Sequence, residues 1–267
     1  MFKQRLLSGI VLVVLAVVVL YLGGYVTWAA VLLLSIGAMF ELLRIYKQHN
    51  TVLGFAAYAA VLAYYLMLLF DMREYILFMF IVAILVILGI YVFAYPKYTD
   101  KEIMAVVFGF FYTTFMFSYV YEIRDLAHGG ILVIMIFICS WVNDTLAYCA
   151  GVTMGKHKMS PKLSPKKSIE GLFGGLLGAA LVGGVYGYFF DKYVYAIERS
   201  VLIFAVIGFA GAIVAVIGDL TASAIKRNND IKDYSNLIPG HGGILDRFDS
   251  IIFTAPVIYY LFIFMVQ

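Results

Sequence analysis

The 267-residue chain is 64% hydrophobic and 17% aromatic but only 13% charged, and its mean hydropathy is +0.98. These values exclude an ordinary soluble domain. The net charge of +3 calls for no nucleic-acid partner, since basic residues beside membrane spans and anionic lipid headgroups account for it.

Apolar runs recur along the chain with the length of membrane-spanning helices, which need about 20 residues. Nine candidates follow one another at roughly residues 6–22, 25–43, 52–70, 75–95, 103–121, 129–150, 171–190, 200–222 and 250–266. The sequence therefore predicts an all-α, polytopic integral membrane protein with about nine transmembrane helices.

The lysines and arginines predict an orientation for these spans. With the N-terminus in the cytoplasm, all but four of the 19 basic residues lie on the cytoplasmic side. The four on the outside are Arg73, Arg124, Lys192 and Arg199. We therefore expect a cytoplasmic N-terminus, an external C-terminus, and two cytoplasmic polar loops at residues 151–170 and 223–249.

Residues 1–125 have short loops, and we expect no charged residue deep within a span there. This half is predicted to be a scaffold for a catalytic region at residues 126–267. In that region Asp144 lies in the sixth predicted span and Asp219 near the inner end of the eighth. An ionisable residue within a span is costly and marks a candidate functional site. The alternative is a carboxylate that reaches the interface or hydrogen-bonds at a helix contact.

The second polar loop concentrates charge beside a glycine-rich turn. Asp219, Ser223 and Lys226 are spaced to share one helix face. Asp246 and Asp249 share a face where the last span opens, so the positive end of that helix is expected to face the same place. From Asp219, Asp246 and Asp249 we predict a site for Mg²⁺, which binds phosphates with few protein ligands. Alternatively, Asp246 and Asp249 only favour a helix N-terminus.

The first polar loop carries five lysines within residues 156–167. Charge alone leaves two interpretations open: a solvated basic stretch that touches anionic lipid, or a site for a triphosphate or a phosphate headgroup. His241, which lies between glycines, is equally compatible with a structural role in the turn.

Taken together, these residues resemble the signature of the phosphatidate cytidylyltransferases, also called CDP-diacylglycerol synthases. The matching positions are Ser223, Lys226-Arg227, Lys232-Asp233, Pro239, His241-Gly242-Gly243 and Asp246-Arg247-Phe248-Asp249. An earlier run is also similar, with Asp144, Tyr148, Gly151, Gly155-Lys156, Ser164-Pro165-Lys166-Lys167-Ser168 and Glu170-Gly171. Ser168 stands where the family more usually has Thr, which keeps the hydroxyl. The specific similarity covers about residues 140–250.

The resemblance implies that CTP and phosphatidic acid react to give CDP-diacylglycerol and pyrophosphate with Mg²⁺, in a homodimer of a prokaryotic cell membrane. The expected catalytic residues are Asp219, Lys226, Arg227, His241, Asp246 and Asp249. The expected substrate-binding residues are Asp144, Lys166, Lys167, Ser168, Ser223, Gly240, Gly242, Gly243 and Arg247.

Two alternatives compete with this function. Another CTP-dependent lipid enzyme, such as a polyprenol or phytol kinase or an archaeal CDP-lipid synthase, is the closer one. The pairing of Pro-x-His-Gly-Gly with Asp-Arg-x-Asp argues against the kinases. An ion-coupled transporter would use Asp144 and Asp219 but leaves the second polar loop unexplained.

Overall fold

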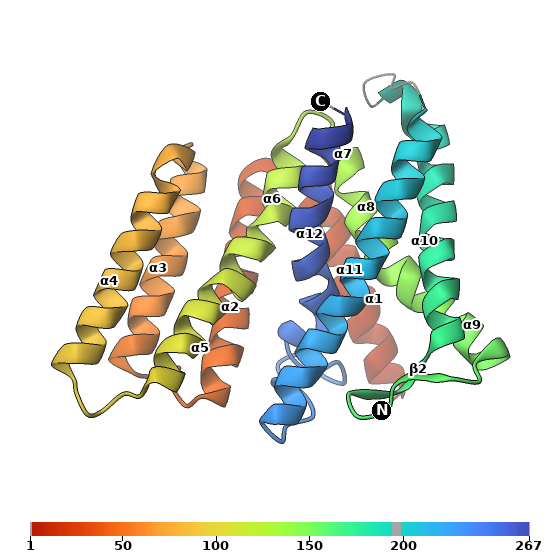
Figure 1. Ribbon diagram of the computed structural model, residues 1–267. Helices are drawn as coiled ribbons and strands as arrows, with labels where there is room; N and C mark the ends of the chain where they lie inside the picture. The colour runs from red at the N-terminus through yellow and green to blue at the C-terminus, as the bar shows by residue number, and fades with distance from the viewer. Residues whose placement is uncertain (1, 194–198, 267) are drawn as a thin grey trace. The chain divides into compact units, whose positions relative to one another are not determined.

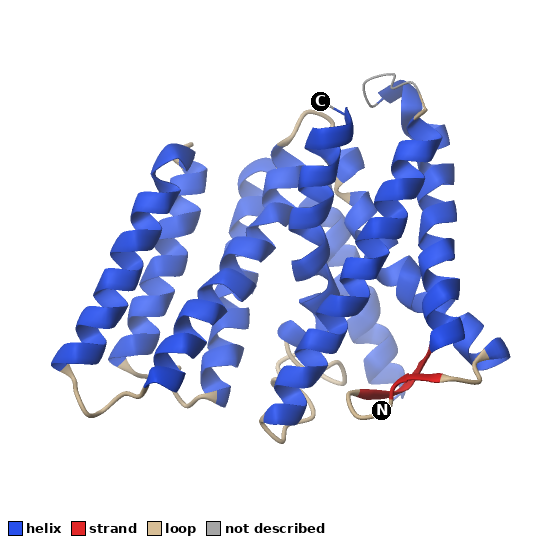
Figure 2. Ribbon diagram, viewed as in Figure 1, coloured by secondary structure: helices blue, strands red, loops and turns tan. Residues whose placement is uncertain are grey.

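The computed structural model describes residues 2–193 and 199–266, and almost all of them are helical (Figures 1 and 2). Within these ranges, eight helical segments are long and apolar enough to cross a membrane, and a shorter apolar helix covers Leu7–Leu22. The predicted all-α, multi-pass architecture is confirmed, with a count close to the expected nine. The strands of the described ranges form one two-stranded hairpin.

The chain divides into two compact units, Met1–Tyr121 with Asp233–Arg247, and Glu122–Lys232 with Phe248–Gln267. The helices up to the first boundary are α1 (Phe2–Leu22), α2 (Gly24–Ile45), α3 (Val52–Leu69), η1 (Arg73–Tyr75), α4 (Ile76–Phe93), α5 (Asp100–Phe110) and η2 (Phe111–Phe115). Helix α6 (Met116–Asp125) crosses that boundary.

The remaining elements are α7 (Gly129–Leu132), α8 (Ile134–Phe137), η3 (Ile138–Val142), α9 (Asn143–Met154), β1 (Lys158–Ser160), β2 (Ser164–Ser168), α10 (Ile169–Phe190), η4 (Asp191–Tyr193), α11 (Ser200–Asn228) and α12 (Leu245–Val266). The predicted division into a scaffold at residues 1–125 and a catalytic region at residues 126–267 is one of function, and it stays a prediction. In the structure, the segment Asp233–Arg247 groups with the first unit.

Side-chain caps fix where several helices begin. The Thr51 hydroxyl accepts a hydrogen bond from the Gly54 amide at the start of α3, and Thr99 and Glu102 form a capping box at the start of α5. The Ser168 hydroxyl accepts one from the Gly171 amide at the start of α10. Such caps satisfy amide groups that the first helical turn leaves without partners.

Glycines allow α9, α10 and α11 of the second unit to pack closely, as the neighbouring ribbons in Figure 1 indicate. A Cβ atom on Gly208 of α11 would lie 2.5 Å from the Ala179 carbonyl oxygen of α10. A Cβ atom on Gly175 of α10 would lie 2.4 Å from the Asn143 side-chain oxygen of α9. The glycine-rich seventh predicted span therefore has the packing role that small residues have in membrane helices.

Two helices extend beyond the apolar spans, as the helix faces predicted for Asp219–Lys226 and Asp246–Asp249 require. Helix α11 continues through Ser223, Lys226 and Arg227 to Asn228, and α12 already begins at Leu245. The non-helical part of the second polar loop is thus only residues 229–244. Hydropathy ends a span where charge begins, whereas helical hydrogen bonding continues through charged residues that are themselves good helix formers.

Candidate functional site

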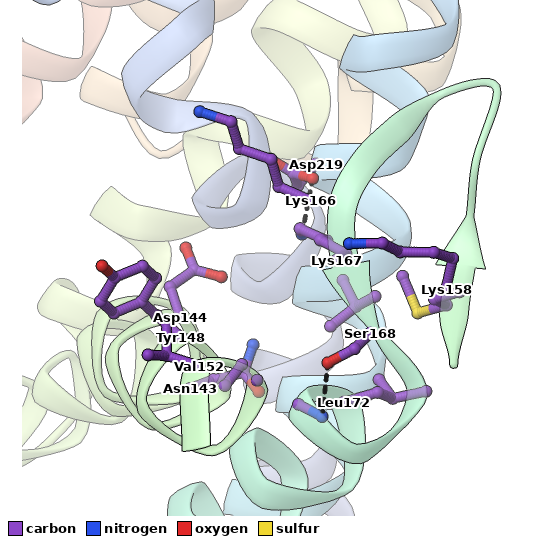
Figure 3. A pocket seen from close by; sticks show the side chains of 15 residues that line it. Asn143, Asp144, Tyr148, Val152, Lys158, Lys166, Lys167, Ser168, Leu172 and Asp219 are labelled. Atoms are coloured by element: carbon purple, nitrogen blue, oxygen red, sulfur yellow. Dashed lines mark hydrogen bonds and ion pairs between the residues drawn. The ribbon is translucent and has the colours of Figure 1, made fainter. Parts of the chain in front are cut away.

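A cavity of about 510 Å³ in the second unit contains five of the predicted site residues. It is lined by side chains of α9, the β-hairpin, α10 and α11, among them Asp144, Lys166, Lys167, Ser168 and Asp219. Figure 3 shows Asp144 and Tyr148 on one side, with Lys167 and Ser168 across from them. The two polar runs that the sequence singled out around residues 144 and 166 therefore meet at one cavity.

An ion pair joins the hairpin to α11 at this cavity. The Lys167 ammonium lies 2.6 Å from a carboxylate oxygen of Asp219, and both side chains are a little under one-third exposed. An unpaired carboxylate within a membrane span is costly, and an opposite charge lowers that cost. Lys167 thus holds the charge of Asp219 inside the protein while both groups remain accessible from the cavity.

Asp249 brings a third carboxylate to the same region of the second unit. It is nearly buried, and one of its oxygens accepts a hydrogen bond from the Ser250 amide over 2.7 Å. Its charge lies within electrostatic range of Asp219, Lys226 and Asp144. Helices α11 and α12 approach closely here, since a Cβ atom on Gly218 would lie 2.7 Å from the Asp249 carbonyl oxygen.

The donor atoms of these aspartates suit a hard divalent cation. Carboxylate oxygens are the ligands that Mg²⁺ prefers, and neighbouring negative charges favour a bound cation. Across residues 2–193 and 199–266, however, no three His, Cys, Asp or Glu side chains form a ready-made metal cluster. The predicted trio of Asp219, Asp246 and Asp249 fits Mg²⁺ in chemistry but is not preassembled around a metal position.

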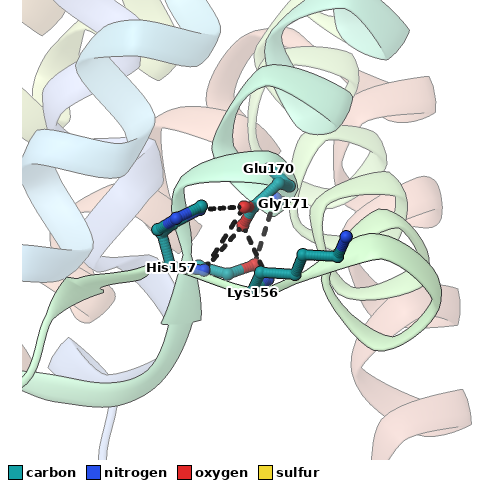
Figure 4. Close-up of polar contacts among 5 residues, drawn as sticks. Lys156, His157, Glu170 and Gly171 are labelled. Carbon is teal, nitrogen blue, oxygen red and sulfur yellow. Dashed lines mark hydrogen bonds and ion pairs between the residues drawn. The ribbon is translucent and has the colours of Figure 1, made fainter.

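The β-hairpin that carries Lys166 and Lys167 is anchored at its base by Glu170 (Figure 4). The Glu170 carboxylate accepts hydrogen bonds from the amides of Lys156 and His157, and lies 2.6 Å from His157 Nδ1. Because Glu170 is the second residue of α10, this contact ties both ends of the hairpin to one helix start. The two cavity lysines are therefore held on a closed segment.

Asn143 is a cavity residue that the sequence analysis did not select. It is fully buried, lines the cavity beside Asp144, and neither polar atom of its amide has a hydrogen-bond partner in the described part of the chain. It directly follows the π-helical segment η3, and such segments are frequent at functional sites. The one feature of the sequence that could have identified Asn143 is its position directly before Asp144, a charged residue within a predicted span.

The glycine-rich turn lies in the first unit and is held partly by α1. The Ser8 hydroxyl lies 2.8 Å from His241 Nδ1 and donates to the Pro239 carbonyl, while Arg247 Nε donates to the His241 carbonyl over 2.7 Å. Gly240 and Gly242 have φ angles of 79° and 82°, which favour glycine. These contacts show a structural role for His241 and Arg247 within the turn.

Asp246 also has a structural role in this turn. One oxygen of its carboxylate accepts hydrogen bonds from the amides of Tyr234 and Gly243, over 2.8 and 2.9 Å. The carboxylate thus joins the two ends of the loop at the start of α12. The interpretation that Asp246 favours a helix N-terminus is supported by these contacts, and a metal role would have to use the same side chain.

Glu41 lies near the end of α2, at the edge of the predicted span 25–43, and is a buried charged residue to which the sequence did not point. Glu41 of α2 is only 2% exposed. Its carboxylate accepts hydrogen bonds from the amides of Ile244 and Leu245, where α12 begins. The positive end of α12 is therefore occupied by a protein carboxylate. The sequence had instead predicted that this helix end faces a phosphate. Hydropathy missed Glu41 because one acid barely changes the average over a span.

The predicted residues thus fall into two groups, one in each unit. In the second unit, the cavity gathers Asp144, Lys166, Lys167, Ser168 and Asp219, with Asp249 and Lys226 in electrostatic range of one another. Ser223 lies one turn beyond Asp219 on α11, and Arg227 is exposed in its last turn. In the first unit, the turn gathers Gly240, His241, Gly242, Gly243, Asp246 and Arg247.

Comparison with known proteins adds a family match that covers nearly the whole chain. The model described as "Cytidylyltransferase family" matches residues 3–265. The phosphatidate cytidylyltransferase of Synechocystis is 32% identical over 297 residues, covering 98% of this chain and 97% of that protein. The proteins of the same name from Bacillus subtilis and Staphylococcus epidermidis are 29% identical over 272 residues and 30% identical over 266 residues. These matches cover 97% and 98% of this chain, and 97% and 99% of those proteins.

The turn predicts a specific intolerance at Gly242. A Cβ atom there would lie 2.8 Å from Asp246 Oδ2, and the positive φ adds about 1–2 kcal/mol of strain. Gly242→Ala should therefore lower turnover more than tenfold, about 1.4 kcal/mol. Gly24→Ala is the matched control, since Gly24 also has a positive φ but nothing lies within 4 Å of its Cβ position. Equal turnover of the two variants would contradict the role of the turn.

Proposed function

The chain belongs to the cytidylyltransferase family, and from this membership we propose that it transfers the cytidylyl group of CTP to phosphatidic acid. The products are CDP-diacylglycerol and pyrophosphate, and the enzyme is a nucleotidyltransferase of the membrane. The observation that carries the proposal is the cavity in which Asp144, Lys167 and Asp219 meet between membrane-spanning helices. A lipid with an anionic headgroup and a water-soluble triphosphate can react only at a charged site that borders the membrane, and this cavity is lined by charged side chains.

The reaction joins two anions. A phosphate oxygen of the lipid attacks the α-phosphorus of CTP, a new P–O–P bond forms, and the bond to the β-phosphate breaks as pyrophosphate leaves. Lysine side chains can offset the repulsion and align the reactants. We assign Lys167, with Lys166 beside it in the cavity, to the lipid phosphate, and Lys226 and Arg227 to the phosphates of CTP. Ser168, Ser223 and Asp144 supply polar contacts around them.

Mg²⁺, when bound, would neutralise phosphate charge and align attack with departure. Asp219 and Asp249 are the residues proposed to hold it, because their carboxylates already lie within electrostatic range of each other. Asp246 is the third predicted ligand. Lys167, which pairs with Asp219 in the structure, is the cation that we assign to the lipid phosphate.

The direct test of the reaction is the release of pyrophosphate from CTP by purified protein in lipid micelles. Release should require phosphatidic acid, and radiolabelled cytidine should appear in the lipid fraction. Transfer of a phosphate to a polyprenol or phytol would favour the kinase alternative instead. Ion flux without CTP turnover would favour a transporter.

The metal proposal predicts that Asp219→Asn and Asp249→Asn each abolish turnover and weaken Mn²⁺ binding measured by electron paramagnetic resonance. Each change removes a negative ligand while keeping the size of the side chain. Asp230→Asn, at an exposed position beyond the end of α11, is the control and should leave both measurements unchanged. Near-normal turnover in the Asp219 and Asp249 variants would remove the metal from these residues.

The division of labour between the lysines predicts different kinetic effects. Lys167→Ala should raise the apparent KM for phosphatidic acid about tenfold and more than that for CTP, whereas Lys226→Ala should lower kcat. The exposed Lys162 does not line the cavity, so Lys162→Ala serves as the control. Each substrate is titrated at a saturating concentration of the other, with lipid expressed as mole fraction. A Lys167 variant that loses affinity for CTP alone would reverse the assignment.

We propose that the polar loops and the N-terminus lie in the cytoplasm, where CTP is found, that the C-terminus lies outside, and that the enzyme is a homodimer. A cysteine introduced at the exposed Leu237, in a Cys149→Ser background, should resist an impermeant thiol reagent in intact cells and react in inside-out vesicles. The opposite pattern would overturn the orientation.

A monomeric mass by light scattering in mild detergent would contradict the proposed homodimer.

A further inference from the structure

The buried carboxylate of Glu41 has no role in the reaction scheme above, although it contacts the predicted catalytic turn. Three hydrogen bonds reach it from a segment about 200 residues later in the chain. The Ser235 hydroxyl donates to Oε1 over 2.6 Å, and the amides of Ile244 and Leu245 donate to Oε1 and Oε2, each over 2.9 Å. Both carboxylate oxygens are thus used by one loop.

The backbone of the turn approaches this carboxylate more closely than a side chain at position 243 would permit. A Cβ atom on Gly243 would lie 2.4 and 2.5 Å from the two oxygens of Glu41. One helical turn earlier on α2, a Cβ atom on Gly37 would lie 2.3 Å from the Ile244 side chain. Gly243 of the turn and Gly37 of α2 therefore both make room for this contact between α2 and the turn.

The chemistry of this contact is that of a buried anion held by a helix end. The amides of Ile244 and Leu245 belong to the start of α12, where the helix dipole favours negative charge. Hydrogen bonds to a charged acceptor are stronger than neutral ones, and their loss leaves buried donors unsatisfied. The interaction fixes the position of the backbone at residues 243–245.

The residues on either side of this point are those predicted to serve the reaction. His241 lies two residues before Gly243, and Asp246 directly follows Leu245. Asp246 binds the Gly243 amide from the other side of the same short segment. A shift of the backbone at Ile244 would therefore move both groups.

We propose that Glu41 is a positioning residue for cytidylyl transfer, which holds the His241–Gly243 turn and the start of α12 in the arrangement that catalysis requires. The inference rests on the proposed function for its kinetic consequence. It gives the first unit a role in the reaction beyond that of a membrane scaffold.

Replacing Glu41 by Gln tests this role in the full-length protein. The amide nitrogen of Gln would place a donor against a backbone donor, so the start of α12 should loosen. We expect kcat to fall about 100-fold, as for a small misplacement of reacting groups, with the KM values for both substrates within twofold. Hydrogen–deuterium exchange of peptides covering residues 236–247 should rise, while peptides of α5 keep their protection.

Two further variants sharpen the result. Ser235→Ala removes one hydrogen bond and keeps the charge and both amide contacts, so its kcat should fall less than about tenfold. Glu74→Gln, in η1, is a control that should change neither measurement. If Glu41→Gln does not fold, Glu41→Asp is measured in the same two ways, since it keeps the charge but withdraws the carboxylate by one methylene group.

Normal kcat or unchanged exchange at residues 236–247 in a folded Glu41 variant would overturn the proposal. Wild-type protein that makes no CDP-diacylglycerol would instead refute the proposed function. In that case the exchange measurement would still decide whether Glu41 holds the turn.

Discussion

The ion pair between Lys167 and Asp219 is the interaction on which the polar cavity depends. A membrane-spanning bundle tolerates a carboxylate only where a cation, a hydrogen-bond donor or water compensates its charge. Lys167 of the hairpin supplies the positive charge that compensates Asp219. Glu170 closes the hairpin at its base. The pair therefore keeps an anionic group accessible inside the protein.

Glu41 satisfies the same constraint in the first unit by a different means. Its charge is held by backbone amides at the start of a helix and by a hydroxyl. The glycine-rich turn is consequently fixed from two sides, by Glu41 and by Asp246. Glycine at position 243 is thus explained by the close approach of the Glu41 carboxylate.

Hydropathy and motif spacing predicted the membrane helices and several residues of the cavity. Long apolar runs are a strong signal, so the membrane helices were found with small errors at their ends. Asp144 and Asp219 were selected because charge within a span is costly, whereas Lys167 was selected from the lysine-rich first polar loop and the family resemblance. Glu41 and Asn143 were missed, because one polar residue hardly alters the hydropathy of a span; the partners of Glu41 also lie about 200 residues away in the sequence. The grouping of residues 233–247 with the first unit depends on those same long-range contacts.

The central proposal is that Asp219 and Asp249 hold the divalent cation that accompanies CTP. The most direct measurement is anomalous diffraction from crystals grown with Mn²⁺ and a non-hydrolysable CTP analogue. The account predicts a Mn²⁺ peak in contact with Asp219 and Asp249, with Lys167 displaced from Asp219. A nucleotide bound with its Mn²⁺ away from both aspartates, and with the Lys167–Asp219 pair intact, would contradict it.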